Sequence, residues 1–218
     1  MIILSNNDRN DIVNDLNLIL SQSKLLTKFP ELFLNKNNSH NFLKIDVNNN
    51  SDQQLSKEQI ENRVKELAKQ IRKDYKEKTI TAICLLKGSL FFTADLTREI
   101  GGKIYLEFMQ LSSYEGENTT GTIKLKKDID FSEIKGKDVL IIEDIVDTGI
   151  TLNYTLEHIK KAGANSVKVC TLLNKPSRRK IKVPIDYVGF EIENKFVLGY
   201  GMDYDQLYRN LPYIGYIE

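Results

Sequence analysis

Hydrophobic and polar residues alternate along most of this chain in patterns that separate helices from strands. Residues 56–75 repeat apolar positions every three or four residues, which predicts an amphipathic helix, and Ser56 with Gln59 forms a capping box at its start. Further helices are predicted at 90–100 and 152–161. Strands are predicted at residues 79–86, 104–109, 139–142, 164–173 and 186–190, of which 139–142 is an unbroken apolar run. This alternation predicts an α/β fold with a parallel sheet.

Two stretches interrupt the pattern. Residues 1–54 contain one amphipathic segment, at 11–23, followed by Asn-rich text that favours turns and solvent. We therefore predict an N-terminal extension, 1–54, with a short helix and an Asn-rich linker, and a core domain, 55–218. The extension either packs on the core or an oligomer interface, or has a regulatory or partner-binding role. The second stretch, 110–128, is polar and turn-rich, and is predicted to be a long loop.

Composition excludes several classes of function. The 218 residues carry a net charge of +1, so no strongly charged surface for a nucleic acid or a membrane is expected. Cys84 and Cys170 lie in apolar runs and are predicted to be reduced core residues, as in cytoplasmic proteins. The two histidines form no cluster with cysteines, so a zinc site is not expected. We find no apolar run of membrane-spanning length and no signal peptide, and we predict a soluble cytoplasmic protein.

Candidate chemistry follows the buried strand at 139–142. Glu143 and Asp144 are adjacent acceptors that suit the paired hydroxyls of a ribose, and Asp147 lies three residues further on. Residues 148–151, Thr-Gly-Ile-Thr, precede a helix, where free N–H groups and the helix dipole favour a phosphate. Any one of the acids could belong to a solvated loop. The complete string after a buried strand favours a ligand site at the carboxyl edge of the sheet.

The string E-D-x-x-D-T-G-x-T resembles the phosphoribosyl-pyrophosphate signature of the type I phosphoribosyltransferases. Other segments narrow the resemblance to the hypoxanthine (hypoxanthine-guanine) phosphoribosyltransferases. These segments are residues 86–89, 111–114, 173–179, 186–192, 194–204 and 208–212. They lie in the expected order from about residue 55 to the C-terminus, about three quarters of the chain.

The resemblance implies a type I phosphoribosyltransferase fold. Its core would be a central five-stranded parallel sheet flanked by helices, with a small hood formed partly by the C-terminal strands. The polar stretch would be a mobile active-site loop, with Ser113 and Tyr114 closing over the reacting centre. Exclusion of water gives such a lid a purpose, because an oxocarbenium-like sugar reacts with water. The family also implies a homodimer or homotetramer.

The implied reaction is Mg²⁺-dependent transfer of the 5-phosphoribosyl group of phosphoribosyl pyrophosphate to hypoxanthine, and also guanine, in purine salvage. Asp147 would be the general base, and Glu143 and Asp144 would hold the ribose hydroxyls. The remaining assignments are Thr148, Gly149, Ile150 and Thr151 for the 5′-phosphate, Lys87, Gly88 and Arg209 for pyrophosphate, Lys175, Phe196, Val197 and Asp203 for the purine, and Asp203, Glu143 and Asp144 for the metal. The family also implies a cis peptide bond at Leu86–Lys87.

Two alternatives remain at this point. One is the same chemistry with xanthine, or with a preference for guanine, because Lys175, Val197 and Asp203 do not settle the purine. The other is a phosphoribosyl-pyrophosphate-sensing regulator that binds RNA. The purine-side residues Lys175 and Phe196 and the nearly neutral charge favour the enzyme. The basic run at 178–182 is interpreted as a solvated or subunit-contact face.

Overall fold

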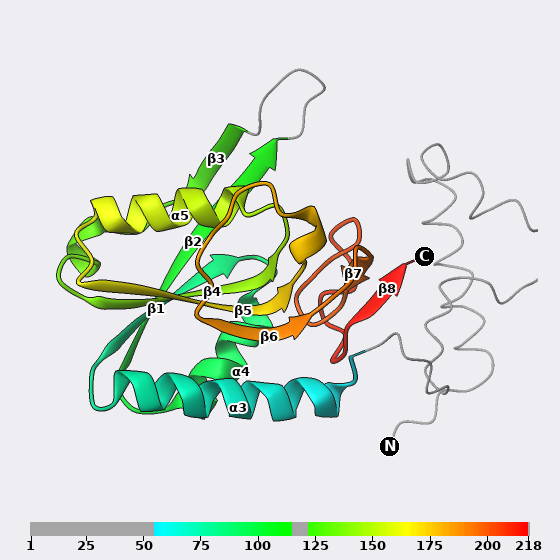
Figure 1. Cartoon of the computed structure of the whole chain (residues 1–218), viewed down its shortest axis with the longest axis horizontal. Coiled ribbons are helices and arrows are strands. Elements are labelled where there is room, and N and C mark those ends of the chain that lie inside the picture. The colour runs from blue at the N-terminus through cyan, green and yellow to red at the C-terminus, as the bar shows by residue number, and fades with distance from the viewer. Residues whose placement is uncertain (1–54, 115–121, 218) are drawn as a thin grey trace, which may run out of the picture. The chain divides into compact units, whose positions relative to one another are not determined.

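The structure, a computed structural model, describes residues 55–114 and 122–217 (Figure 1). The predicted extension, its helix at 11–23 and the Asn-rich linker lie outside these residues. The helices are α3 (Lys57–Tyr75), α4 (Leu90–Ile100) and α5 (Ile150–Lys161), with 3-10 turns η2 (Phe131–Glu133) and η3 (Pro176–Arg178). The strands are β1 (Ile80–Leu86), β2 (Ile104–Tyr114), β3 (Thr122–Lys127), β4 (Asp138–Val146), β5 (Ser166–Asn174), β6 (Tyr187–Glu191), β7 (Phe196–Leu198) and β8 (Gly215–Ile217).

The main sheet has the strand order β3-β2-β1-β4-β5-β6. Strands β2, β1, β4, β5 and β6 are parallel, which confirms the predicted five-stranded parallel core, and β3 adds an antiparallel edge strand beside β2. The chain passes from β1 to β2 on one side and later returns to β4 on the other side of β1. Ligands of open α/β sheets bind beyond the carboxyl ends of strands at such a reversal.

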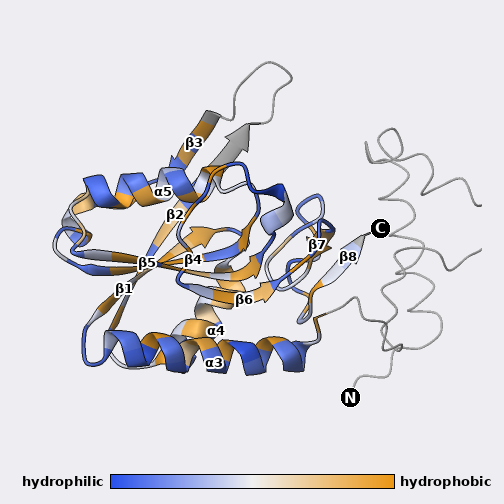
Figure 2. Cartoon of the chain, in the orientation of Figure 1, coloured by the Kyte–Doolittle hydropathy of each residue, from blue (hydrophilic) through white to orange (hydrophobic). Residues whose placement is uncertain are grey.

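Helices cover both faces of the sheet, with α3 and α4 on one face and α5 on the other (Figure 1). The apolar stripe of each helix turns toward the strands, as the hydropathy colouring shows (Figure 2). The predicted capping box is confirmed, because Ser56 Oγ accepts a hydrogen bond from Gln59 N at 3.2 Å and Ser56 N donates to Gln59 Oε1 at 2.8 Å. Cys84 and Cys170 are buried and free, also as predicted.

Two predicted boundaries are wrong. Strand β4 does not end at residue 142 but continues through Glu143 and Asp144 to Val146, because its backbone keeps pairing with β5 as far as Asn174. The predicted loop at 110–128 is in large part a hairpin: β2 runs on to Tyr114 and pairs with β3. Polar residues suit this hairpin because it lies at the edge of the sheet. The residues between the two strands, 115–121, lie outside the described part of the chain.

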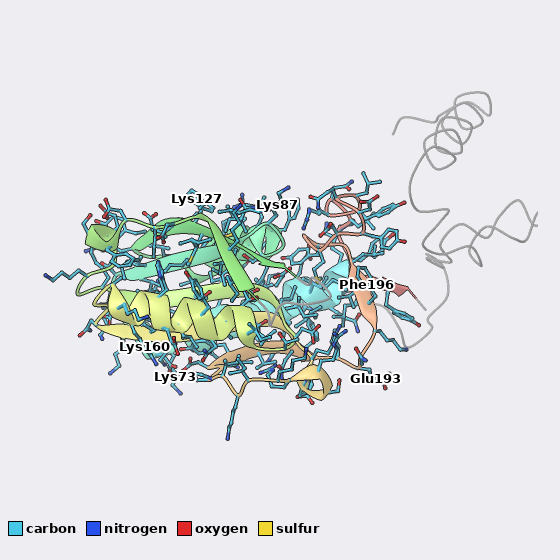
Figure 3. All side chains as sticks on the ribbon, turned by 90° about the horizontal axis from the view of Figure 1, so that it is seen from above. Lys73, Lys87, Lys127, Lys160, Glu193 and Phe196 are labelled. Carbon is cyan, nitrogen blue, oxygen red and sulfur yellow. The ribbon has the colours of Figure 1, made fainter. Side chains whose placement is uncertain are left out.

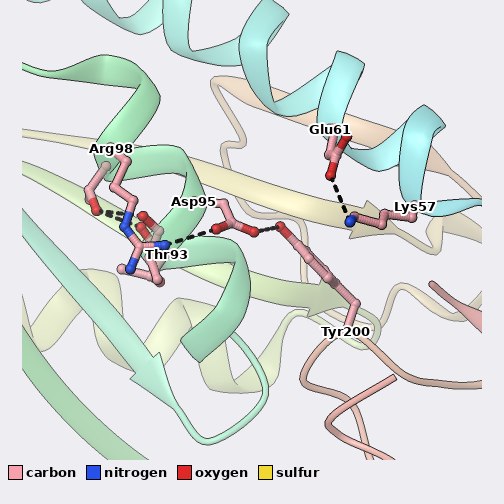
Figure 4. A network of polar contacts seen from close by, with 8 residues as sticks. Lys57, Glu61, Thr93, Asp95, Arg98 and Tyr200 are labelled. Atoms are coloured by element: carbon pink, nitrogen blue, oxygen red, sulfur yellow. Dashed lines mark hydrogen bonds and ion pairs between the residues drawn. The ribbon is translucent and has the colours of Figure 1, made fainter. Parts of the chain in front are cut away.

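A smaller sheet at the C-terminus forms the predicted hood, which we define as residues 196–217. Its strands β7 and β8 pair antiparallel, and Ile214 exchanges two backbone hydrogen bonds of 3.0 Å with Leu55, just before α3. Tyr200 joins the hood to α4, because its hydroxyl donates to Asp95 Oδ2 at 2.7 Å (Figure 4). Among the described residues, we find no helix with the length and hydropathy needed to cross a membrane.

Candidate active site

A pocket of about 380 Å³ opens at the carboxyl ends of β1 and β4, where the strand order reverses. It collects side chains from the turn after β1, from β4, from the start of α5 and from the hood. Its lining residues are Leu85, Leu86, Lys87, Gly88, Leu111, Glu143, Asp144, Thr151, Asp203 and Arg209. Seven residues assigned from the sequence, Lys87, Gly88, Glu143, Asp144, Thr151, Asp203 and Arg209, therefore share one cavity.

The turn after β1 fits tightly between β4 and the hood. The Leu86–Lys87 peptide bond is cis, as the family resemblance implied. A Cβ atom on Gly88 would lie 1.7 Å from Asp144 Oδ2, and one on Gly201 would lie 1.9 Å from the Gly88 carbonyl oxygen. Position 201 therefore requires glycine, because the clashing atom is main chain and φ is 106°, whereas a Cβ at position 88 would displace the Asp144 carboxylate. This contact brings the hood residues Asp203 and Arg209 to the same cavity as Lys87.

The two acids on β4 lie in a poorly solvated site. Burial, and then the neighbouring charge of Asp144, raises the pKa of Glu143 well above its usual value. Burial raises the pKa of Asp144 to about 6, against the opposing effects of backbone hydrogen bonds and Arg209. Glu143 Oε2 is buried and accepts no hydrogen bond from the described residues. Such acceptors suit a ligand that brings its own hydroxyl groups or positive charge.

A second, smaller pocket of about 70 Å³ adjoins the first along the loop between β4 and α5. Asp147, Thr148 and Gly149 line it together with Thr151, which both pockets share, so three more sequence assignments meet there, whereas Ile150 begins α5 and does not line it. Gly149 has φ 82°, a left-handed conformation that favours glycine, and it starts α5 without a side-chain cap. The N-terminus of α5 thus adjoins a small cavity through Thr151 and Leu152, while the Ile150 N–H makes a long contact of 3.4 Å with Thr148 Oγ1.

Asp147 points into this region with an incompletely paired carboxylate. Its Oδ1 is buried and accepts no hydrogen bond from the described part of the chain, and it lies 3.4 Å from Arg178 Nε. A carboxylate oxygen beside the pocket that accepts no hydrogen bond can accept a proton from a bound ligand.

Three of the residues assigned to the purine follow β5 or lie on β7, outside the lining of either pocket, whereas the fourth, Asp203, lines the larger pocket. Lys175 directly follows β5, is 5% exposed, and donates from Nζ to the Lys195 carbonyl at 2.8 Å. Burial lowers the pKa of its ammonium, and the charge of Asp147 opposes that shift. Phe196 is 52% exposed on the hood and meets Tyr204 edge to face at 5.8 Å (Figure 3). Val197 lies beside it on β7.

On the hood side of the larger pocket, polar side chains are joined by a series of ion pairs and hydrogen bonds. Arg209 Nη2 pairs with Asp203 Oδ1 at 2.6 Å, and its Nη1 donates to the Gly201 carbonyl at 2.7 Å. Gln206 N donates to Asp203 Oδ2 at 2.9 Å, and Lys87 Nζ donates to Gln206 Oε1 at 3.1 Å. The sequence interpretation did not identify Gln206, since a glutamine in a loop carries no signal of its own.

One interpretation of the sequence was wrong at this edge. The basic run at 178–182 is not uniformly solvated, because Arg179 turns inward and donates to the carbonyls of Val146 and Asp147, both at 3.0 Å. It also donates to Asn174 Oδ1 at 2.6 Å. Ser113 and Tyr114, which were predicted to belong to a lid, lie at the end of β2, with side chains outside the described part.

Comparison with known proteins agrees with this arrangement. Residues 51–205 match the family model described as the phosphoribosyl transferase domain. The chain is 46% identical over 166 residues to a hypoxanthine-guanine phosphoribosyltransferase of Bacillus subtilis, covering 75% of this chain and 91% of that protein.

Solved structures give the same result. A hypoxanthine-guanine phosphoribosyltransferase of Bacillus anthracis, crystallised with HEPES in its active site, is 44% identical with a TM-score of 0.73, over 77% of this chain and 99% of that one. A Trypanosoma cruzi hypoxanthine phosphoribosyltransferase in complex with the product IMP is 39% identical with a TM-score of 0.69, over 76% and 94% of the two chains. The chain therefore belongs to the hypoxanthine phosphoribosyltransferases, the type I phosphoribosyltransferases of purine salvage, and is a transferase.

Proposed function

We propose that this enzyme transfers the 5-phosphoribosyl group of phosphoribosyl pyrophosphate to hypoxanthine and guanine, giving IMP or GMP and pyrophosphate. The observation that carries the proposal is the arrangement of two neighbouring pockets around the β4 acids. One pocket is lined by Lys87 and Arg209, which suit a pyrophosphate, and the other by the loop at 147–151, which suits a single phosphate. A ribose that carries a 5′-phosphate and a pyrophosphate would place one group in each pocket when its hydroxyls contact Glu143 and Asp144.

The two ends of the substrate would be held differently. The 5′-phosphate would accept hydrogen bonds from Thr148, Thr151 and the backbone around Gly149 and Ile150. The pyrophosphate would lie against Lys87, Gly88 and Arg209, where the planar guanidinium can contact two phosphate oxygens. Fixing both ends orients the C1′ carbon toward the purine, so that part of the activation entropy is lost on binding rather than in the reaction.

The bond changes balance without a further reactant. Purine N9 forms a bond to C1′ as the bond from C1′ to the pyrophosphate oxygen breaks, and the proton on N7 passes to Asp147. The Oδ1 of Asp147, which accepts no hydrogen bond from the described residues and has only a longer ion-pair contact of 3.4 Å with Arg178, supports the general-base role. Deprotonation at N7 leaves the purine of the product nucleotide neutral, and the electron pair of the broken bond leaves with pyrophosphate.

Mg²⁺ fits the larger pocket only with help from the substrate. Among the residues described, no group of three or more His, Cys, Asp or Glu side chains could hold a metal alone. Asp203, Glu143 and Asp144 nevertheless line one cavity, and Glu143 keeps an unpaired buried oxygen. These carboxylates would hold Mg²⁺ together with substrate oxygens and water, as this ion prefers. The bound ion would neutralise charge that develops on the leaving pyrophosphate.

Lys175 supports a 6-oxopurine. An ammonium has only donors, so two of its N–H groups remain for an exocyclic carbonyl oxygen once one is bonded to Lys195. Adenine presents an amino group at this position and would leave the buried ammonium without an acceptor. Phe196 would stack on the purine face, and the Val197 backbone would contact its edge. A homodimeric or homotetrameric assembly and a cytoplasmic location stay predictions.

A spectrophotometric assay with phosphoribosyl pyrophosphate, with and without Mg²⁺, tests the proposal on hypoxanthine, guanine, xanthine and adenine in parallel. We expect Mg²⁺-dependent nucleotide formation from hypoxanthine and guanine only. Turnover of xanthine would contradict the proposed substrate range. Folded protein that binds phosphoribosyl pyrophosphate but makes no nucleotide from any base would contradict the proposed reaction.

A further inference from the structure

The segment after β5, residues 175–181, binds one side of the loop at 147–151 and of the strand end before it. We call this loop the phosphate loop. The Val146 carbonyl accepts from Lys175 N and Arg179 Nη2, both at 3.0 Å, and the Asp147 carbonyl accepts from Arg179 Nε at 3.0 Å. The Thr148 carbonyl accepts from the backbone N–H groups of Lys180 and Ile181, at 2.9 and 3.0 Å. Three consecutive carbonyls are thus bonded on one side of the loop.

This pattern fixes the other side of the loop as well. In a trans peptide the C=O of one residue and the N–H of the next point in opposite directions. When the carbonyls of residues 146–148 bind the 175–181 segment, the N–H groups of residues 147–149 turn the other way. The same residues, Asp147, Thr148 and Gly149, line the small pocket, where N–H groups turned away from the 175–181 segment can serve a ligand. The bonded carbonyls therefore aim a set of N–H donors at the phosphate position.

Among these described contacts with the loop carbonyls, Arg179 supplies the side-chain donors, whereas its neighbour Arg178 meets the Asp147 carboxylate at 3.4 Å. The Arg179 guanidinium is half-buried, and its described partners are neutral: two backbone carbonyls and the Asn174 amide oxygen, at 2.6 Å. Within the described residues it pairs with no carboxylate. The contact is also close, because a Cβ on Gly149 would lie 3.0 Å from Arg179 Cδ and 2.4 Å from the Ile181 carbonyl oxygen. Its planar fork matches two adjacent carbonyls in a way that a lysine cannot.

We propose that Arg179 is a positioning residue that orients the backbone of residues 146–148, and with it the 5′-phosphate amides and the Asp147 carboxylate. It acts through the loop and touches no substrate. The inference rests on the proposed function for the identity of the ligand. It also links two sites, because the same segment begins with Lys175, the residue assigned to the purine.

Binding of two probes to four proteins tests the proposal. Calorimetry would measure the dissociation constants of ribose 5-phosphate, which uses the phosphate loop, and of magnesium pyrophosphate, which uses the Lys87 and Arg209 side. The proteins are the wild type, Arg179→Met, Arg179→Lys and Lys182→Met. Lys182 is the matched control, because it is an exposed cation of the same basic run and no contact of its side chain is found in the described part.

For Arg179→Met we expect ribose 5-phosphate to bind on the order of 10-fold to 100-fold more weakly, because small displacements of oriented groups have effects of this size. Pyrophosphate affinity should stay at the wild-type value, and Arg179→Lys should resemble Arg179→Met. Lys182→Met should resemble the wild type with both probes. In turnover, Arg179→Met should raise KM for phosphoribosyl pyrophosphate and lower kcat together.

Three outcomes would overturn the proposal. Unchanged ribose 5-phosphate binding in Arg179→Met would show that the fork does not position the loop. An equal loss of affinity for both probes would show that Arg179 has a general role in folding. Full recovery in Arg179→Lys would show that the charge, rather than the fork, is what matters. These binding measurements need no turnover. A wild-type protein that binds ribose 5-phosphate but makes no nucleotide would contradict the proposed function, yet the four proteins could still be compared in their ribose 5-phosphate affinity.

Discussion

The two ends of the active site are built by different means. At the phosphate end, backbone groups dominate: a glycine turn, the first turn of α5, and carbonyls bonded to the segment after β5. At the pyrophosphate end, charged and polar side chains dominate, with Lys87, Gln206, Asp203 and Arg209 joined in one chain of contacts. The hood backbone there includes four non-glycine residues with positive φ, at positions 200, 205, 206 and 208.

This difference fits the chemistry proposed for each end. The 5′-phosphate stays attached to the ribose throughout the reaction, so a site made of fixed backbone dipoles suits it. Pyrophosphate must be bound, stabilised as it leaves, and released, and side chains that already have other partners can exchange them. Changes at one end should therefore affect one probe and spare the other.

The largest expected effect is on chemistry at the phosphate end. Asp147→Asn removes the proton acceptor while keeping the size of the side chain, so kcat should fall by about 10²- to 10⁴-fold. The affinity for phosphoribosyl pyrophosphate should change little, because the loop is held by its carbonyls. Steady-state kinetics with calorimetry measures both. Loss of binding at unchanged kcat would contradict the general-base role.

The next effect separates the two ends directly. Arg209→Gln removes the guanidinium and leaves Asp203 without its ion pair, so magnesium pyrophosphate should bind about 100-fold more weakly. Ribose 5-phosphate binding should not change. Arg98→Gln is the control, since Arg98 is 77% exposed and its one ion pair within the described residues is with Asp95 on its own helix. A parallel loss of ribose 5-phosphate binding would show that the two ends are not independent.

Asp144 lies between the two ends, and its ionised carboxylate should lower the free energy of unfolding at neutral pH. Its folded pKa, about 6, lies above its ordinary 3.8, so the protonated form is favoured by folding and stability is lost as pH rises through 6. Asp144→Asn should raise the free energy of unfolding by roughly 3 kcal/mol above pH 6, and the gain should shrink toward pH 4. Urea unfolding at several pH values measures this gain.

Asp138→Asn is the contrasting control for that series. Hydrogen bonds from Ser166 hold the pKa of Asp138 below its ordinary value, so its stabilising effect is present at neutral pH and lost on acidification. That variant should be less stable than the wild type at pH 7. If both variants changed stability in the same direction at pH 7, burial would not be the reason for the raised Asp144 pKa.

The smallest effect tests how the hood is held. Tyr200→Phe removes the hydrogen bond to Asp95, so unfolding should become easier by about 1 kcal/mol and pyrophosphate binding should weaken slightly (Figure 4). Lys57→Gln, which breaks an exposed pair with Glu61 in the same region, should leave both unchanged. Thermal unfolding with calorimetry compares them. Equal effects of the two variants would argue against Tyr200 as an anchor.

The sequence predicted most of the scaffold and the chemical core because both have local signals. The apolar run at 139–142 and the acids and small residues after it gave the strand, the loop and the start of α5. The continuation of β4 through Glu143 could not be predicted in this way, because pairing with Thr171 and Leu173 of β5 holds acidic residues in the strand. The β2–β3 hairpin was missed for a similar reason, since polar edge strands lack an apolar pattern.

Arg179 shows a second limit. In the sequence it is one of several basic residues, and nothing nearby indicates its acceptors. They are main-chain oxygens of Val146 and Asp147, about thirty positions away, which residue identity does not reveal. Lys175, by contrast, was found through the family resemblance, although its burial and its contact with Lys195 were not predicted.

The contact among Gly88, Asp144 and Gly201 has a consequence for local opening of the fold. Because a Cβ on Gly201 would lie 1.9 Å from the Gly88 carbonyl oxygen, the turn after β1 and the hood touch through their main chains. Separation of the hood from this contact would also expose the amides of the turn to solvent. Amides on both sides of the contact should therefore exchange with solvent as one cooperative unit. A ligand bound at Arg209 would then slow exchange at the turn after β1 as strongly as in the hood itself.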